Sequence, residues 1–539
     1  MKISGKLVDV HLRRIYPATI EIIDGRIESI EETGNSSEQY IMPGLIDSHV
    51  HIESSMVTPG AFALEAVKHG TIGTVSDPHE IANVLGIKGV EYMIVDGRKT
   101  PFYFWFGAPS CVPATEFETN GGTINRDDIY ELMGNDRIKY LSEVMNFPGV
   151  IYDNDDILYK IKVAKGFNKP VDGHAPGLKG KNLKKYIGAG ISTDHECTTS
   201  KEALEKIKLG MKILIREGSA ARNMEALKGL FKKYPQKIML CSDDIHPEML
   251  INGHINKMVA KLVNEGYDLF DVLRSCTLNP VGHYDLEAGI LRKGDPADLI
   301  IVDEPKKMNV LETWIKGEKV YDRGKVSFRY NKGPAVNNFN CSEVVESQIK
   351  VSKTGKRLKV MQAFDGELFT REIAVMPGPE TNVKANISQD ILKIVVKDRY
   401  TDGPPAVGFI KGFGLKEGAF ASSVAHDSHN IICIGTNDYD IVSCINELVR
   451  LQGGLAVKSG KKEKSFQLNI GGIMSDNSCE EVAGSYKDLE NMIRSFGCNL
   501  KAPLMTLSFM ALLVIPELKM SDRGLFDGRT FKIIPLFTD

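Results

Sequence analysis

The chain has 539 residues, of which 42% are hydrophobic and 25% are charged, an ordinary composition for a globular protein. Its net charge of −3 provides no general attraction to nucleic-acid phosphates or anionic lipid. No apolar run is long enough for a membrane span, and the nine cysteines contain no CxxC pair. We therefore expect three or four domains in a cytoplasmic protein with reduced thiols, without nucleic-acid or membrane partners.

The first 40 residues have the pattern of short strands. Lys6–Val10 and Ala18–Ile23 are strand-like, and Asp24-Gly25 is a hairpin signal. Strand-like patterns return after Asn279, at Ala297–Val302 and Val310–Ile315. We expect the strands from both flanks to pair in one small β domain.

Between these flanks, eight β-rich runs alternate with segments of helix length. The runs are Leu45–His51, Thr71–Asp77, Phe102–Gly107, Lys139–Met145, Pro170–His174, Gly190–His195, Lys212–Glu217 and Lys237–Asp243. Alternating strands and helices indicate a parallel sheet, and eight units in about 240 residues fit a (β/α)8 barrel. A doubly wound open sheet is the alternative, which the count of eight disfavours.

The predicted fold class is therefore α/β, with a TIM-like barrel, a small β-sandwich domain and an α+β C-terminal domain. The small domain is expected at 1–42 plus 285–335, the barrel at 43–284 and the C-terminal domain at 336–539, after a linker at 334–340. The last domain is long enough for its own core. Its clearest elements are a strand at Ile391–Val396 and helices at Ile441–Gln452 and Leu489–Phe496.

Imidazoles and carboxylates gather at the ends of the predicted strands, where barrel enzymes have their active sites. They include His49, His51, Asp77, His79, Glu80, Glu143, His174, His195, Glu196, Asp243 and Asp244. A lone histidine is usually a hydrogen-bonded core residue, but a set of this size indicates a metal site. Four imidazoles and two acids exceed one tetrahedral site and suit two metals about 3.5–4 Å apart. The two oxygens of Glu143 make it the natural bridge between them.

Two motifs resemble those of the amidohydrolase superfamily of metal-dependent hydrolases. Pro43–His51 is similar to its PGxIDxHxH signature, and Gly294–Leu299 resembles its closing motif. Narrower motifs resemble the bacterial adenine deaminases, so that the resemblance covers nearly the whole chain. These are Glu53–Met56, Ser76–Glu80, Glu143–Val150, Asp172–Pro176, Cys241–Asp244 and Ala425–Asn430.

This resemblance implies hydrolysis of adenine to hypoxanthine and ammonia, a reaction of purine salvage, at a dinuclear centre. It places His49, His51 and Asp243 on one metal and His174 and His195 on the other. Glu143 would bridge them where many relatives carry a carboxylated lysine, because Lys139 is not at the end of its strand. The resemblance further implies Mn²⁺ or Fe²⁺ more than Zn²⁺, a small purine base as substrate and a homodimer.

The expected mechanism needs two proton-transferring groups. Hydroxide supplied by the metals attacks C6 of adenine, and Asp243 takes a proton that it later delivers to the leaving amino group. A second acid must protonate a ring nitrogen. Glu80 is the first candidate and His79 the second, although Glu80 could instead be a carboxylate that stabilises a helix start. Asp244, at the next strand position, is expected to point away from Asp243.

Four residues are candidates for contact with the purine. Glu118 and Arg216 lie near predicted strand ends, and His426 and His429 lie in a polar loop that could cover the barrel mouth. Simpler interpretations are an exposed loop acid for Glu118, a rim salt bridge for Arg216 and a local turn for the two histidines.

Other functions on the same scaffold remain alternatives. The metal ligands alone would equally suit hydrolysis of a cyclic amide or of an N-acetyl sugar. A non-catalytic, hydantoinase-like assembly protein is a more remote possibility, since such a protein would be expected to lose ligands, whereas all six are present here.

Overall fold

The computed structural model describes residues 1–34, 38–219, 221–365 and 367–539, which divide into two compact units. Unit 1 comprises Met1–His79, Val90–Cys111 and Ile124–Gly333. Unit 2 comprises Pro334–Asp539 together with two short earlier segments, Glu80–Gly89 and Val112–Thr123. None of the described helices combines the length and apolarity needed to cross a membrane. The predicted division into three domains stays a prediction.

Unit 1 contains a closed barrel of eight parallel strands. They are β5 (Leu45–Val50), β6 (Thr71–Ser76), β7 (Tyr103–Ala108), β8 (Ile138–Val144), β9 (Val171–Gly173), β10 (Thr193–Asp194), β11 (Lys212–Arg216) and β12 (Ile238–Cys241). β5 to β9 form one hydrogen-bonded run and β10 to β12 another. Parallel bridges between Val171 and Ile191 and between Val50 and Asp243 join the two runs. The predicted barrel is confirmed, and the open-sheet alternative is wrong.

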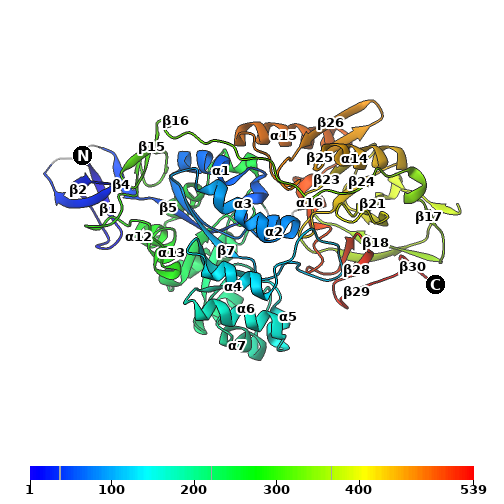
Figure 1. Cartoon of the computed structure of the whole chain (residues 1–539), viewed down its shortest axis with the longest axis horizontal. Coiled ribbons are helices and arrows are strands. Elements are labelled where there is room, and N and C mark those ends of the chain that lie inside the picture. The colour runs from blue at the N-terminus through cyan, green and yellow to red at the C-terminus, as the bar shows by residue number, and fades with distance from the viewer. Residues whose placement is uncertain (35–37, 220, 366) are drawn as a thin grey trace. The chain divides into compact units, whose positions relative to one another are not determined.

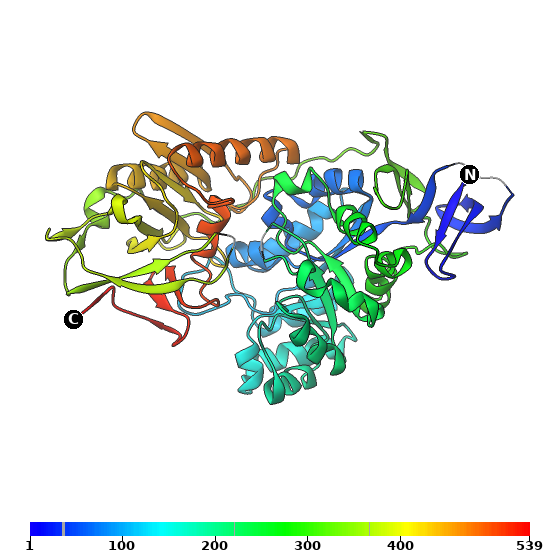
Figure 2. The same ribbon diagram turned by 180° about the vertical axis from the view of Figure 1, so that it is seen from behind.

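Helices surround the barrel strands, as both views of the molecule show (Figures 1 and 2). They include α1 (Pro59–Ala66), α3 (Ile87–Gly97), α4 (Arg126–Gly134), α6 (Asp155–Gly166), α7 (Gly180–Gly188), α8 (Ser200–Lys208), α11 (Ile255–Asn264), α12 (Leu269–Ser275) and α13 (Leu278–Tyr284). Helix α11 buries Ile255, Val259 and Leu262, which the helical repeat places on one face. Helices cover the outer face of the barrel strands and side chains fill the barrel interior, so the strands are buried on both faces.

Strands from both flanks of the barrel form one eight-stranded sheet in unit 1, in the order β16-β15-β14-β13-β4-β1-β2-β3. Their bounds are β1 (Lys2–Asp9), β2 (Arg14–Ile23), β3 (Arg26–Glu32), β4 (Tyr40–Pro43), β13 (Leu299–Val302), β14 (Val310–Ile315), β15 (Glu318–Asp322) and β16 (Lys325–Val326). The antiparallel pair of β4 and β13 joins the two flanks, with Ile41 opposite Ile301. One core cluster contains Leu7, Ile20 and Trp314. The predicted pairing of the flanks is confirmed.

Unit 2 is built on a sheet in the order β19-β18-β22-β21-β24-β23-β25-β26, with β30 beside β18. Their bounds are β18 (Arg357–Gln362), β19 (Arg371–Val375), β21 (Ile391–Lys397), β22 (Ala406–Lys411), β23 (Ala419–Ser422), β24 (Ile431–Gly435), β25 (Gly454–Ser459), β26 (Lys462–Gln467) and β30 (Phe537–Thr538). Helix α14 (Asp438–Leu451) packs against β23, β24 and β25. α15 (Cys479–Ser495) packs against β25 and β26, and α16 (Pro503–Phe509) against β23 and β24. The predicted strand and both predicted helices are confirmed.

Helix α15 begins ten residues earlier than predicted, because Ser478 and Glu481 form a capping box.

The two early segments of unit 2 are held to its later part by Asn338. Its side-chain amide donates to the carbonyls of Val84 and Gly121, at 3.1 and 3.0 Å.

Helix α8, which packs outside the barrel strands, contains a fully buried lysine that yields a stability prediction. Lys206 Nζ donates to Asp194 Oδ2 and Glu202 Oε1, each at 2.9 Å, and to the Ala175 carbonyl at 2.7 Å. Lys206→Ala would leave two buried carboxylates unpaired, so unfolding of unit 1 should become easier by about 3–5 kcal/mol. Calorimetry should show a lower thermal midpoint, whereas exposed Lys208→Ala should leave it nearly unchanged. Equal midpoints for both variants would contradict this role.

Candidate metal centre

The six predicted ligands converge at one end of the barrel. They are His49 and His51 at the end of β5, Glu143 at the end of β8, His174 after β9, His195 after β10 and Asp243 after β12. Their ligand atoms fall into overlapping groups whose members lie within 4.8 Å of one another. Five of the six residues are buried, and His174 is partly buried.

Glu143 has imidazoles on both of its oxygens. Oε1 lies 3.3 Å from His51 Nε2, while Oε2 lies 2.6 Å from His174 Nδ1 and 3.2 Å from His195 Nε2. Burial would raise the pKa of Glu143, but His174 and His195 outweigh it and hold the pKa well below its usual range. The carboxylate is therefore ionised and faces two sets of imidazoles, as a bridging ligand must.

His49 and Asp243 supply the other side of the centre. Asp243 Oδ1 lies 3.3 Å from His51 Nε2 and 3.5 Å from His49 Nε2. Both ring nitrogens of His49 are buried and have no hydrogen-bond partner among the described residues. A buried imidazole without hydrogen bonds is costly in a folded protein, so these ligand atoms fit a divalent metal ion.

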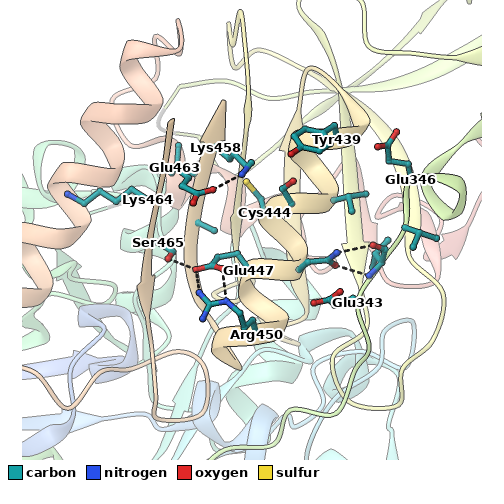
Figure 3. Close-up of a pocket in the computed structure, with 17 residues that line it drawn as sticks. Glu343, Glu346, Tyr439, Cys444, Glu447, Arg450, Lys458, Glu463, Lys464 and Ser465 are labelled. Carbon is teal, nitrogen blue, oxygen red and sulfur yellow. Dashed lines mark hydrogen bonds and ion pairs between the residues drawn. The ribbon is translucent and has the colours of Figure 1, made fainter. Parts of the chain in front are cut away.

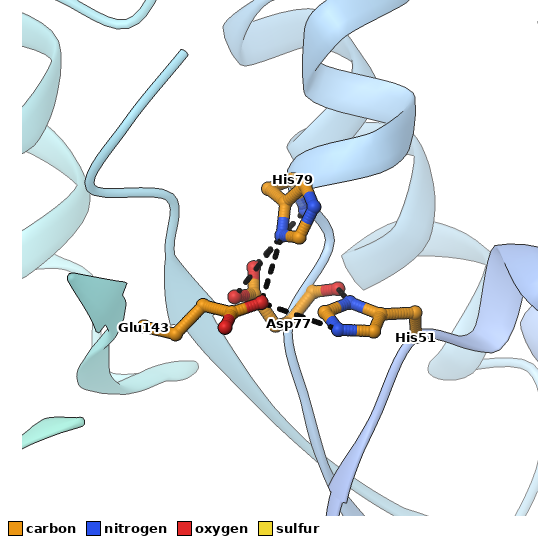
Figure 4. A group of neighbouring side chains, drawn as sticks. All are labelled: His51, Asp77, His79 and Glu143. Atoms are coloured by element: carbon orange, nitrogen blue, oxygen red, sulfur yellow. Dashed lines mark hydrogen bonds and ion pairs between the residues drawn. The ribbon is translucent and has the colours of Figure 1, made fainter. Parts of the chain in front are cut away.

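Asp77 and His79 extend this group, as Figure 4 shows. His79 Nδ1 lies 3.2 Å from Asp77 Oδ2 and 3.6 Å from Glu143 Oε1. The carbonyl of Asp77 lies 3.2 Å from His51 Nδ1. His79, a predicted catalytic candidate, is thus beside the centre. Asp77 directly follows β6 and was placed at a strand end by the sequence, but no role was predicted for it.

Arg216 neutralises two acids at the centre. Its Nη1 donates to both Glu196 Oε1 and Asp243 Oδ2, Nη2 donates to Glu196 Oε2 at 3.1 Å, and Nε donates to the Ala221 carbonyl at 2.6 Å. Burial would raise the pKa of Asp243, but Arg216 in particular holds it well below its usual range. All three guanidinium nitrogens are engaged, as the salt-bridge interpretation required. The sequence placed Glu196 at a strand end, but no role was predicted for it.

Asp244 does not point away from Asp243, so that expectation is wrong. The carboxylate oxygens of Asp243 and Asp244 and a nitrogen of His51 lie within 4.8 Å of one another, and Ser54 Oγ donates to Asp244 Oδ1 at 2.5 Å. Strand β12 ends at Cys241, and Asp243 has a φ of +56°. The alternation of side chains along a strand therefore does not extend to these two residues.

Asp47 positions two ligand-bearing segments and was also missed. Its Oδ1 accepts the backbone N–H groups of His49 at 3.2 Å and Ser242 at 3.1 Å. Its Oδ2 lies 2.8 Å from Nε2 of His254, whose other ring nitrogen contacts Thr71. One buried carboxylate thus aligns the residues next to two predicted ligands.

The remaining predicted residues belong to unit 2. Glu80 lies in the first turn of α2 (His79–Leu85), and its carboxylate oxygens contact His426 Nδ1 and His429 Nε2. Glu118 is only 4% exposed, so its interpretation as an exposed loop acid is wrong. Burial and the charge of Asp427 raise the pKa of Glu118 well above its usual range, and its Oε2 has no hydrogen-bond partner among the described residues.

A surface pocket of about 780 Å³ also lies in unit 2, between α14, β25, β26 and the segment at 343–346 (Figure 3). Acidic and basic side chains of its lining pair with each other, as Glu447 does with Arg450 and Glu463 with Lys458. None of the predicted site residues is in this lining. The pocket therefore contributes nothing to the chemistry considered above.

Comparison with known proteins identifies the family. Residues 40–320, just over half of the chain, match the model of the amidohydrolase family, and residues 367–532 match that of the adenine deaminase C-terminal domain. The adenine deaminase of Methanosarcina mazei is 49% identical over 552 residues, covering 100% of both chains. That of Salinibacter ruber is 48% identical, covering 100% of this chain and 99% of its own. The chain belongs to the adenine deaminase family.

One solved structure resembles this adenine deaminase family member at much lower identity. A β-aspartyl dipeptidase from Fervidobacterium islandicum AW-1 covers 61% of this chain and 99% of its own, at 16% identity and a TM-score of 0.47.

For this adenine deaminase family member, Asp47 provides a test of how the ligands are held. Asp47→Asn would replace one carboxylate oxygen, which accepts hydrogen bonds, by an NH2 group, which donates them. This group would face either the two backbone N–H groups or His254, so contacts on one side of residue 47 would be lost. We expect metal affinity to fall about 10–100-fold, measured by titration with a metal chelator. Asp9→Asn is the matched control, because Asp9 also accepts two backbone N–H groups, from His11 and Leu12, but lies in β1. Unchanged affinity in Asp47→Asn would show that this carboxylate does not position the ligands.

Proposed function

We infer that the protein catalyses the hydrolytic deamination of adenine to hypoxanthine and ammonia, with a small purine base as its substrate. The observation that carries this inference is near-50% identity to curated adenine deaminases over the whole chain, including the C-terminal domain. Hydrolysis of a cyclic amide or an N-acetyl sugar has no comparable support. A non-catalytic role is disfavoured by the complete set of buried ligands.

We propose that the centre holds two divalent ions, Mn²⁺ or Fe²⁺ rather than Zn²⁺. His49, His51 and Asp243 would hold one ion, His174 and His195 the other, and Glu143 both. The donor number and the two-sided contacts of Glu143 support this assignment. When bound, such ions make a nucleophile available from water near neutral pH.

The protein groups then move protons to and from defined atoms. Asp243 accepts a proton from the attacking water and returns it to the amino group that leaves as ammonia. Arg216, which donates to Asp243 Oδ2, leaves Oδ1 facing the histidines and keeps the carboxylate ionised. Glu80 gives a proton to the ring nitrogen. Its Cα atom is about 3.8 Å from that of the preceding residue, His79, which lies beside the centre.

Among the predicted purine contacts, we favour Glu118. Its raised pKa favours the protonated carboxyl, which can donate one hydrogen bond to a ring nitrogen and accept another. Arg216 is less suited because its nitrogens are engaged, and the contacts of His426 and His429 with Glu80 suggest a different role for these two. A homodimer and a cytoplasmic location stay predictions.

The direct test is ammonia release by the purified, Mn²⁺- or Fe²⁺-loaded protein. We expect ammonia and hypoxanthine from adenine, and no turnover of a cyclic amide or of an N-acetylated amino sugar. Adenosine, which carries a ribose on N9 of the same purine, is a second comparison. Turnover of the cyclic amide without turnover of adenine would overturn the proposed function.

The bridge is tested by Glu143→Gln. A neutral amide offsets less repulsion between two dications, so the metal content should fall below two ions per chain by elemental analysis. Glu287→Gln is the control, because Glu287 is 77% exposed and pairs with Lys139, the other candidate on β8. Two ions per chain in Glu143→Gln would remove Glu143 from the bridging role.

A further inference from the structure

Two histidines of one loop in unit 2 hold the carboxylate of Glu80. Oε1 contacts His426 Nδ1, and Oε2 lies 2.5 Å from His429 Nε2. Glu80, His426 and His429 are 2%, 6% and 1% exposed, so water does not compete for these contacts. Each oxygen therefore has its own imidazole, and the two imidazoles are not equivalent.

His429 is a fixed donor. The backbone N–H of Ala425 donates to His429 Nδ1 at 3.3 Å, which requires a lone pair on that nitrogen. The neutral ring then carries its hydrogen on Nε2 and donates it to Glu80. Burial lowers the pKa of His429 to about 4, and Arg399 acts in the same direction, so that the ring stays neutral near pH 7.

His426 is placed to share a proton. Its ring stacks on Phe509, with centroids 5.0 Å apart and planes at 16°, which fixes the direction of Nδ1 toward Glu80 Oε1. Either Oε1 or Nδ1 can hold the hydrogen of this contact, because a carboxylate oxygen and an imidazole nitrogen can each bind a proton. The nearby ionisable groups of unit 2 include His429, Asp427, Glu118 and Arg399.

We propose that His426 and Glu80 store one shared proton that Glu80 delivers to the purine ring, with His429 holding the second oxygen. This deepens the proposed function and rests on it. An isolated glutamic acid, with an ordinary pKa of about 4.3, would have lost its proton near pH 7 and could not act as an acid. When His426 shares this hydrogen bond, the pair keeps the proton as an imidazolium beside a carboxylate. Glu80 can then transfer it to the ring nitrogen of the purine.

The proton balance of the reaction closes with this pair. The shared proton leaves Glu80 as the O–H bond breaks and an N–H bond forms on the ring. The carboxylate that remains is stabilised by the N–H of His429. Of the two protons of the water consumed, one leaves on ammonia through Asp243 and the other restores the Glu80–His426 pair. No oxidant, reductant or additional reactant is required.

The experiment compares conservative replacements that keep the shape of each hydrogen bond. His426→Asn places an amide near Nδ1, which can donate or accept but cannot store a proton. His429→Gln places an amide nitrogen near Nε2 and preserves the donor. We therefore expect His429→Gln to rescue most of the kcat lost in His429→Ala. His426→Asn should not rescue His426→Ala, and its kcat should be about 10²-fold below wild type with little change in KM for adenine.

Thermal midpoints and metal content of all four variants serve as folding controls. If the loop merely clamps Glu80, both conservative variants will rescue activity to the same extent, which would overturn the proposal. Full kcat in His426→Ala would overturn it as well. Failure of the proposed function is a separate outcome, because the wild-type protein would then release no ammonia from adenine.

Discussion

The seam that closes the barrel is the constraint on which the metal centre depends. At this seam the N–H of Asp243 donates to the carbonyl of His49 at 2.9 Å, and the N–H of His51 donates to the carbonyl of Asp243 at 3.2 Å. The backbone atoms that join the last strand to the first thus belong to three of the predicted ligands. The hydrogen bonds that close the barrel therefore also position this half of the metal centre, so a distortion of one distorts the other.

Electrostatic balance then determines which side chains can share this space. Glu143, Asp243 and Glu196 are buried together, and like charges at such distances would repel strongly. Arg216 supplies a permanent positive charge to the last two, while imidazoles surround the first. Divalent ions would add the positive charge that the histidines, in their neutral ligand form, do not supply.

Much of the fold and the ligand set could be predicted from the sequence. Strand–helix alternation is a local pattern, and it predicted the barrel. The HxH pair at the end of β5 is also local, and it predicted two of the ligands. The roles of Asp47 and Glu196 could not be predicted, because each depends on partners that only the closed barrel brings near. Asp244 was mispredicted because its strand ends early. The partners of Glu80 lie 346 and 349 residues away, beyond any local pattern.

The interleaving of the two units also affects how the chain is made. Glu80–Gly89 and Val112–Thr123 leave the ribosome early, but the rest of unit 2 follows only after Gly333. At about 5–20 residues per second, their partners appear tens of seconds later. In this interval Ile81 and Val84, both fully buried in the finished protein, lack part of their cover. Until the rest of unit 2 has been synthesised, the first of these segments therefore exposes apolar side chains that are buried in the finished protein.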